Sequence, residues 1–405
     1  MRHFGSARCV LLALGGISIP VIACLATSVA ASPQTRASIG KELAELKGSD
    51  SVAGNRFGTS VALSGTTAVV GASGWFPSNG DGRAYVFTKT LTGWRQAAEL
   101  KGSDSAAGDR FGASVAISGT TAVVGAPNHA KDAGRAYVFT RTAAGWKQTA
   151  ELRGFDTVAG DYFGQAVEVS GTTVVVGASG HARLAGRAYV FARTAAGWKQ
   201  TTELKGPDNV AGDYFGYSVA ISGTTIVVGA AAHADQTGMA CVFTKTATGW
   251  EQDAELDGSD TGAGGGWFGE SVAISGSSII VGADNQTSGA GRAYVFTKTA
   301  AGWRQAAKLK GSDTVAGDQF GGSVTISGPT AVVGAIGHAN FAGRAYVFAR
   351  SSIGWEQVAE LKGSDTSPGG DWFGASVAFA FSTVLVGAPL HAMQAGRAYM
   401  FTTRD

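Results

Sequence analysis

The chain has 405 residues, of which 32 are Lys or Arg and 30 are Asp or Glu, so its formal net charge is only +2. A surface this close to neutral lacks the basic bias expected of a nucleic-acid-binding protein, and we expect no such partner. Glycine is abundant, with 61 residues, whereas cysteine occurs three times, which indicates a turn-rich protein without a disulfide framework.

Residues 1–31 have the pattern of an export signal. Arg2 and Arg8 give a positive start, an apolar stretch follows, and residues 29–31 (VAA) provide a small-residue cleavage site. A lipoprotein signal is the second interpretation, because residues 21–24 (VIAC) resemble a lipobox in which Cys24 would carry the lipid. The chain is therefore predicted to be secreted or held at the cell surface, without a membrane span.

Residues 32–405 are predicted to form one domain built from a repeat of about 52 residues. A Phe-Gly pair marks each of the seven copies: Phe57-Gly58, Phe111-Gly112, Phe163-Gly164, Phe215-Gly216, Phe268-Gly269, Phe320-Gly321 and Phe373-Gly374. Internal self-similarity of this kind means that each unit buries its apolar face against its neighbours.

The second copy shows what each unit builds. Two short apolar runs, 115–117 and 123–124, flank a tight turn, and 136–140 (AYVFT) is typical of a third strand. Residues 146–152 alternate well enough for a fourth strand, and no window has a useful helical period. The sequence therefore predicts an all-β fold, a seven-bladed β-propeller of four-stranded blades. An open solenoid would need atypical capping repeats, and none are evident.

The two ends of the domain predict how the ring closes. The last copy stops directly after its third strand, at 401–405, and so lacks a fourth. Residues 37–48 (ASIGKELAELKG) align without gaps to 143–154 (AAGWKQTAELRG), which contain the fourth strand of the second copy. The N-terminal segment is therefore expected to pair with the last blade, which removes the exposed sheet edges.

The run from Phe111-Gly112 to 125–127 (GAP), followed by 134–139 (GRAYVF), resembles the FG-GAP repeat of integrin α-subunit propellers and bacterial surface proteins. The resemblance extends over 37–405 and implies the propeller fold, but it specifies no function. Integrin-type blades often carry a calcium loop between the first two strands. Here that place holds Ser170-Gly171-Thr172-Thr173 or its equivalents, without the carboxylates that a hard cation needs, so we expect no calcium there.

One Asp and one His recur together in five copies. The pairs are Asp109 and His129, Asp161 and His181, Asp213 and His233, Asp318 and His338, and Asp371 and His391. The first and fifth copies lose both residues, reading Asn55 with Trp75 and Gly266 with Gln286. Positions that change together indicate contact, so we expect a hydrogen bond within each pair. Both residues are predicted to lie in loops on the same face of the ring.

Three roles remain open for these pairs. The Asp could simply accept a hydrogen bond from the His and fasten two loops together, or the pair could contact a ligand. A metal site would need further ligands, such as Asp104 and its equivalents, because one His and one Asp per blade are too few. We predict no metal and no cofactor.

Variable residues flank the Phe-Gly pairs on the same predicted face. Four of the residues directly before the Phe are aromatic, which suits stacking on sugar rings or anchoring a protein partner: Tyr162, Tyr214, Trp267 and Trp372. In contrast, the tryptophans that begin the fourth strands, such as Trp146, are expected to pack between blades. Arg135 and its equivalents are expected to pair with an acid, and Cys241, which replaces a Tyr, to be a core residue.

These observations predict an exported, non-enzymatic binding or adhesion propeller that recognises a cell-surface glycan or protein through its repeated blade-top loops, where weak sites gain strength by multivalency. The alternative is a structural or scaffolding module without a small ligand. An enzyme ranks third, because a propeller enzyme usually gathers different residues into one asymmetric site, and no hydrolase, metalloprotease or phosphate-loop motif occurs.

Overall fold

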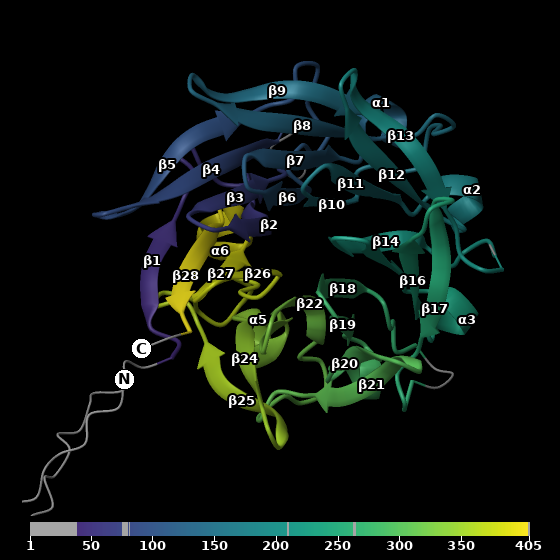
Figure 1. Cartoon of the computed structure of the whole chain (residues 1–405). Coiled ribbons are helices and arrows are strands. Elements are labelled where there is room, and N and C mark those ends of the chain that lie inside the picture. The colour runs from purple at the N-terminus through teal and green to yellow at the C-terminus, as the bar shows by residue number, and fades with distance from the viewer. Residues whose placement is uncertain (1–38, 75–79, 81, 209, 262–264, 404–405) are drawn as a thin grey trace, which may run out of the picture. The chain divides into compact units, whose positions relative to one another are not determined.

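The computed structural model describes residues 39–74, 80, 82–208, 210–261 and 265–403. These residues form seven four-stranded antiparallel sheets arranged as the blades of a ring (Figure 1). The predicted all-β, seven-bladed propeller is thus confirmed. The predicted signal, 1–31, and Cys24 within it lie outside the described residues.

The second blade shows the plan shared by all seven. Its strands follow the chain from the centre outward, as β6 (Ser114–Ser118), β7 (Thr121–Ala126), β8 (Arg135–Thr142) and β9 (Gly145–Leu152). Ser118 pairs with Thr121, so β6 and β7 are joined by a two-residue turn. Since Gly119 has a φ of 57°, a conformation that glycine adopts without strain, the Ser-Gly-Thr-Thr segment forms this turn.

The other blades repeat this order. Their strands, listed blade by blade from the innermost outward, are β2 (Phe57–Ser64), β3 (Thr67–Ala72), β4 (Arg83–Thr90) and β5 (Gly93–Leu100); β10 (Ala166–Ser170), β11 (Thr173–Ala178), β12 (Arg187–Thr194) and β13 (Gly197–Leu204); β14 (Phe215–Ser222), β15 (Thr225–Ala230), β16 (Met239–Lys245) and β17 (Trp250–Leu256); β18 (Ser271–Ser275), β19 (Ser278–Ala283), β20 (Arg292–Thr299) and β21 (Gly302–Leu309); β22 (Phe320–Ser327), β23 (Thr330–Ala335), β24 (Arg344–Ser351) and β25 (Gly354–Leu361); and β26 (Ser376–Ala380), β27 (Thr383–Ala388), β28 (Arg397–Thr402) and β1 (Glu42–Leu46).

The core lies between adjacent blades. Phe111 of the Phe-Gly pair is fully buried, and its ring centroid lies 5.4 Å from that of Tyr137 and 6.1 Å from that of Phe139. The same cluster includes Val69 of the preceding blade, with Trp146 packed at its edge, so the predicted packing role of Trp146 is confirmed. Cys241 is also fully buried, as predicted, and burial raises its thiol pKa to about 12.

The N-terminal strand closes the ring, as predicted. β1 pairs antiparallel with β28, so that the first strand of the chain completes the last blade, and in Figure 1 the purple β1 runs beside the yellow β28. The Gly40 N–H donates to Thr402 O at 2.8 Å, which extends the ladder past the strand ends. Glu45 accepts a hydrogen bond from Arg397 at 2.5 Å, just as Glu151 accepts one from Arg135 at 2.8 Å within the second blade. The expected acid partner of this arginine is thereby confirmed in both blades.

Within the described ranges, no helix is long and apolar enough to cross a membrane.

Candidate functional site

In six blades, the connection between the second and third strands contains one short left-handed helical turn. The six turns are α1 (His129–Asp132), α2 (His181–Leu184), α3 (His233–Gln236), α4 (Gln286–Gly289), α5 (His338–Phe341) and α6 (His391–Gln394). In α1, Ala130, Lys131 and Asp132 have φ values of 54°, 61° and 65°, so the turn is left-handed. Left-handed conformation costs an L-residue about 1–2 kcal/mol, so the surroundings must hold each turn in place.

The predicted Asp–His pairs anchor these turns. His Nδ1 hydrogen-bonds to Asp Oδ2 at 2.8 Å in His129–Asp109, 2.9 Å in His181–Asp161, 3.0 Å in His233–Asp213 and 2.9 Å in His338–Asp318. In the fifth pair, the corresponding atoms of His391 and Asp371 lie 3.2 Å apart. The predicted hydrogen bond is therefore confirmed in four pairs, whereas in the fifth the two side chains are close but His391 Nδ1 makes no hydrogen bond. His129 begins its left-handed turn, and Asp109 lies in the loop that precedes the first strand of the same blade.

In four of these pairs the Asp also accepts a hydrogen bond from its own loop. Asp109 Oδ2 accepts the Ala106 N–H at 2.8 Å, and the Asp109 residue is only 8% exposed. Asp161 and Asp318 accept the equivalent N–H groups of Val158 and Val315 at the same distance. The carboxylate therefore holds a backbone turn on one side and the imidazole on the other.

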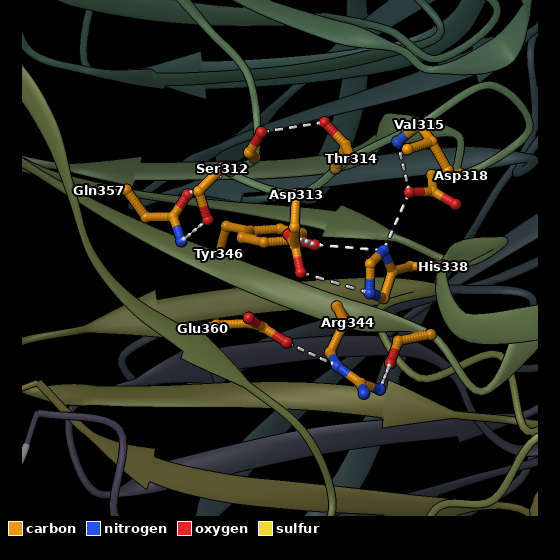
Figure 2. A network of polar contacts seen from close by, with 12 residues as sticks. Ser312, Asp313, Thr314, Val315, Asp318, His338, Arg344, Tyr346, Gln357 and Glu360 are labelled. Carbon is orange, nitrogen blue, oxygen red and sulfur yellow. Dashed lines mark hydrogen bonds and ion pairs between the residues drawn. The ribbon is translucent and has the colours of Figure 1, made fainter.

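A second carboxylate lies beside the other imidazole nitrogen. In Figure 2, His338 lies between Asp318 and Asp313, and the separation from His338 Nε2 to Asp313 Oδ2 is 3.6 Å. Asp313 Oδ1 in turn accepts the Tyr346 hydroxyl at 2.8 Å. Burial and this hydrogen bond raise the pKa of Tyr346. The network thus ties the left-handed turn to the preceding loop and to the third strand, which favours the loop-fastening role.

In the fifth blade, other residues take the places of the Asp and the His. Gln286 replaces the His, and its amide donates to Asp260 O at 2.8 Å. A Cβ atom built on Gly266 would lie 2.5 Å from Gln286 Oε1, so an Asp at residue 266 would require this flexible amide to move. Residues 266 and 286 therefore lie side by side in the fifth blade, as the Asp and His do in the other blades. In the first blade, Trp75 lies outside the described residues.

Within the described part of the chain, three groups of acids and histidines come close enough to hold a metal ion: Asp156, His181 and Glu203; Asp208, Asp213 and His233; and Asp313, His338 and Glu360. Most of these carboxylates already have protein partners. Glu360 accepts from Arg344 at 2.7 Å, and Glu203 accepts from Arg187 at 2.6 Å. Coordination would break these contacts, so the absence of a metal stays our prediction.

The residues before the Phe-Gly pairs share one backbone conformation. All seven have φ between 55° and 58°, the left-handed region: Arg56, Arg110, Tyr162, Tyr214, Trp267, Gln319 and Trp372. None is glycine, although glycine would adopt this conformation at lower cost. The N–H of Tyr162 donates to Asp132 O of the preceding blade at 2.7 Å, so these residues lie at the junctions between blades. Trp267 is 38% exposed.

One asymmetric cluster joins the fourth and fifth blades to the first two. Burial, followed by the neighbouring Asp284 carboxyl, raises the Glu270 pKa far above its usual range. Burial and the nearby acids raise the pKa of Tyr217 to about 12, and burial and Arg56 lower the pKa of Arg110. The folded protein therefore holds the Glu270 proton more tightly than the unfolded chain does.

Neither Glu270 nor its partner Asp284 is among the site residues that the sequence predicts. The sequence does mark Asp284 by its place in the repeat. It follows the Gly-Ala at the end of the second strand, where the other blades carry Ser73, Pro127, Ser179, Ala231, Ile336 and Pro389. Asp284 is only 5% exposed. A single buried acid in a ring of small or apolar residues was therefore visible, although its partner was not.

The ring of four-stranded blades and the repeated loop network define a β-propeller with one shared loop face. The chain belongs to the FG-GAP repeat family, whose model matches residues 41–87, 94–139, 146–191, 198–243, 250–296, 303–348 and 355–401. Each match starts in the outer strand of one blade and ends in the third strand of the next, so the sequence repeat is offset from the blade by one strand.

The structure is similar to the crystal structure of Saccharomyces cerevisiae Sqt1, with a TM-score of 0.50 and 10% sequence identity over 87% of this chain and 84% of that one. At this identity the likeness concerns the fold alone. No curated protein matches the sequence significantly. An FG-GAP propeller is compatible with a non-enzymatic binding module.

Proposed function

We propose that the protein is an exported, non-enzymatic binding propeller that recognises a glycan or a protein at a cell surface through its blade-top loops. The observation that supports this proposal most directly is the left-handed conformation of all seven residues that precede the Phe-Gly pairs. Large side chains occupy positions where glycine would be less strained, and such strain is typical of functional positions. Export is proposed from residues 1–31, with a lipid anchor at Cys24 as the variant.

Within this proposal the aromatic members make the contacts. Tyr162, Tyr214, Trp267 and Trp372 present flat rings at four blade junctions, where they suit sugar rings or apolar anchors of a protein. Weak contacts at several junctions add through multivalency. The Asp–His pairs support this surface by holding its loops, because in four of them the imidazole and the carboxylate already hydrogen-bond to each other.

These internal hydrogen bonds of the Asp–His pairs also favour one alternative, a scaffolding module without a small ligand. In that case the loops would be rigid simply to keep the ring in shape. The two functions differ in what the aromatic rings do, and a substitution that keeps the backbone conformation separates them.

The test replaces Trp267 and Trp372 by glycine, which retains the left-handed backbone and removes the rings. We expect binding to a glycan array, or to protein-bearing cell surfaces in flow cytometry, to fall at least about tenfold, while the melting temperature is kept or raised. Protease treatment of the cells separates a protein target from a glycan.

Phe381 provides the matched control. It is 75% exposed with a φ of 56°, and it lies in the β26–β27 turn, at the opposite end of the inner strand from Trp372. F381G should change stability in the same direction without affecting binding. Unchanged binding in W267G/W372G would refute the proposed contacts and favour the scaffolding alternative.

A further inference from the structure

The inner strands of all seven blades surround a central cavity of about 210 Å³. Its lining consists mainly of Val, Ala, Ile and Leu, with Phe379 and Thr325 at two positions. Among the lining residues, Glu168 of β10 carries the one ionisable side chain. A cavity that is otherwise lined by uncharged, mostly aliphatic residues thus contains a single carboxyl group.

Glu168 is an exception to the repeat. The equivalent residue is alanine in five blades and threonine in the sixth: Ala62, Ala116, Ala220, Ala273, Ala378 and Thr325. Ala116 and Ala220 are 1% and 4% exposed, packed between blades. The longer Glu168 side chain instead lines the cavity, where its Oε1 accepts the Val169 N–H at 3.2 Å.

The backbone adds further acceptors to this wall. Each inner strand is hydrogen-bonded to one neighbour only, so alternate residues direct both N–H and C=O away from the sheet. The outward N–H of Val115 is taken by the Ser60 hydroxyl at 2.9 Å, and that of Val169 by Glu168. By the same geometry, the carbonyl oxygens of these residues point away from the paired strand.

We propose that the central cavity binds a primary alkylammonium ion, with its charged end on Glu168 and its chain along the aliphatic wall. An ammonium group has three donors and no acceptor, which matches one carboxylate among backbone carbonyls. A hydrated divalent cation would demand more carboxylates than the lining offers. The volume suits a short chain, since cavities of about 150 Å³ already hold benzene.

Burial raises the pKa of Glu168 to about 7. The strands packed against β10, which are β6, β7, β11 and β14, carry one other ionisable side chain, Tyr217, whose pKa burial raises to about 12. Ammonium binding requires the ionised carboxylate, so the affinity should increase as the pH rises through neutrality.

The experiment measures binding of n-hexylammonium to the whole mature chain by calorimetry, with hexanol and hexanoate as neutral and anionic probes. We expect millimolar or tighter binding of the amine alone. E168A introduces the residue that five other blades carry, so it should fold normally and weaken the amine at least about tenfold. Adding T325E to E168A moves the carboxyl to another lining position and should restore binding.

Equal affinity of the wild-type protein and E168A for the amine would overturn the proposal. So would equal binding of hexanol, or no binding of hexylammonium by folded wild-type protein at millimolar concentrations. Should T325E fail to fold, the pH dependence of the wild-type protein decides: an affinity that is flat from pH 6 to 8 contradicts a role for Glu168. None of these outcomes depends on what the blade-top loops bind.

Discussion

At the scale of single residues, the asymmetry of this ring lies in a few substituted positions. Glu270 and Asp284 bring two carboxyls into contact where the other blades pair smaller or neutral side chains, such as Thr59 with Ser73. Two adjacent carboxyls cannot both ionise at moderate cost, so the folded protein holds a proton that the unfolded chain releases. Stability therefore depends on pH at this site.

The sign of this dependence follows from the raised Glu270 pKa. The contribution of the protonated pair is fully present below the pKa of the unfolded chain and is lost as pH rises toward the folded value. We expect urea unfolding of the wild-type protein to show falling stability from pH 5 to pH 9, and E270Q, whose amide needs no proton, to gain about 1–2 kcal/mol at pH 9.

The control for this prediction is E356Q, which changes an exposed glutamate of the fourth strand of the sixth blade. It should leave the pH profile as it is. If E270Q and the wild-type protein had parallel profiles, the proton would not reside on Glu270.

At the scale of the elements, the left-handed turns explain why Asp and His occur as a pair. Ala182 and Arg183 have φ values of 51° and 61°, and no glycine relieves the α2 turn. The interactions of His181 with Asp161 and Asp156 compensate for this conformation. In α4, Gly289 occupies the third left-handed position, where glycine is unstrained. This turn therefore needs less stabilisation, and Gln286 can replace the His.

A double-mutant cycle tests this coupling. H181Q removes the imidazole that hydrogen-bonds to the buried Asp161 carboxylate, so we expect a loss of about 1–2 kcal/mol. D161G/H181Q reproduces the fifth blade and should cost less than the sum of the single changes by about 1 kcal/mol. Urea unfolding gives the four free energies, and strict additivity would contradict a coupling between the two residues.

At the scale of the whole molecule, stability depends on closing the ring with the first strand. β1 supplies Leu46, which is 3% exposed in a core shared with Phe57 and Met400, and Glu45, which binds Arg397. Because the sequence repeat is offset by one strand, the last blade is built from both ends of the chain. Opening that blade would expose the edge of β28 along its length.

Deleting residues 37–48 should lower the free energy of unfolding by about 3–5 kcal/mol, through the loss of Leu46 and of one strand ladder. Scanning calorimetry would show this as a lower melting temperature, and sedimentation would show association through the free edge. A synthetic 37–48 peptide added to the truncated protein should restore much of the loss, whereas a scrambled peptide should not. A truncated protein that is monomeric and equally stable would contradict closure by β1.

The amino-acid sequence by itself determined the architecture. The Phe-Gly spacing, the strand pattern and the match of 37–48 to the other fourth strands specify seven blades and their closure, because one local pattern repeated seven times leaves few ways to bury each apolar face. The joint loss of Asp and His in two copies also predicted their contact, because each residue is the hydrogen-bond partner of the other.

The tertiary structure alone decided the rest. It placed Asp313 at the second nitrogen of His338, joined Glu270 to Asp284 and turned Glu168 into the cavity. The backbone conformation before each Phe-Gly pair was equally invisible in the sequence, since Arg, Tyr, Trp and Gln give no local sign of a left-handed φ. The physical reason is common to all four: each depends on neighbours from another strand, loop or blade, and a local pattern carries no information about them.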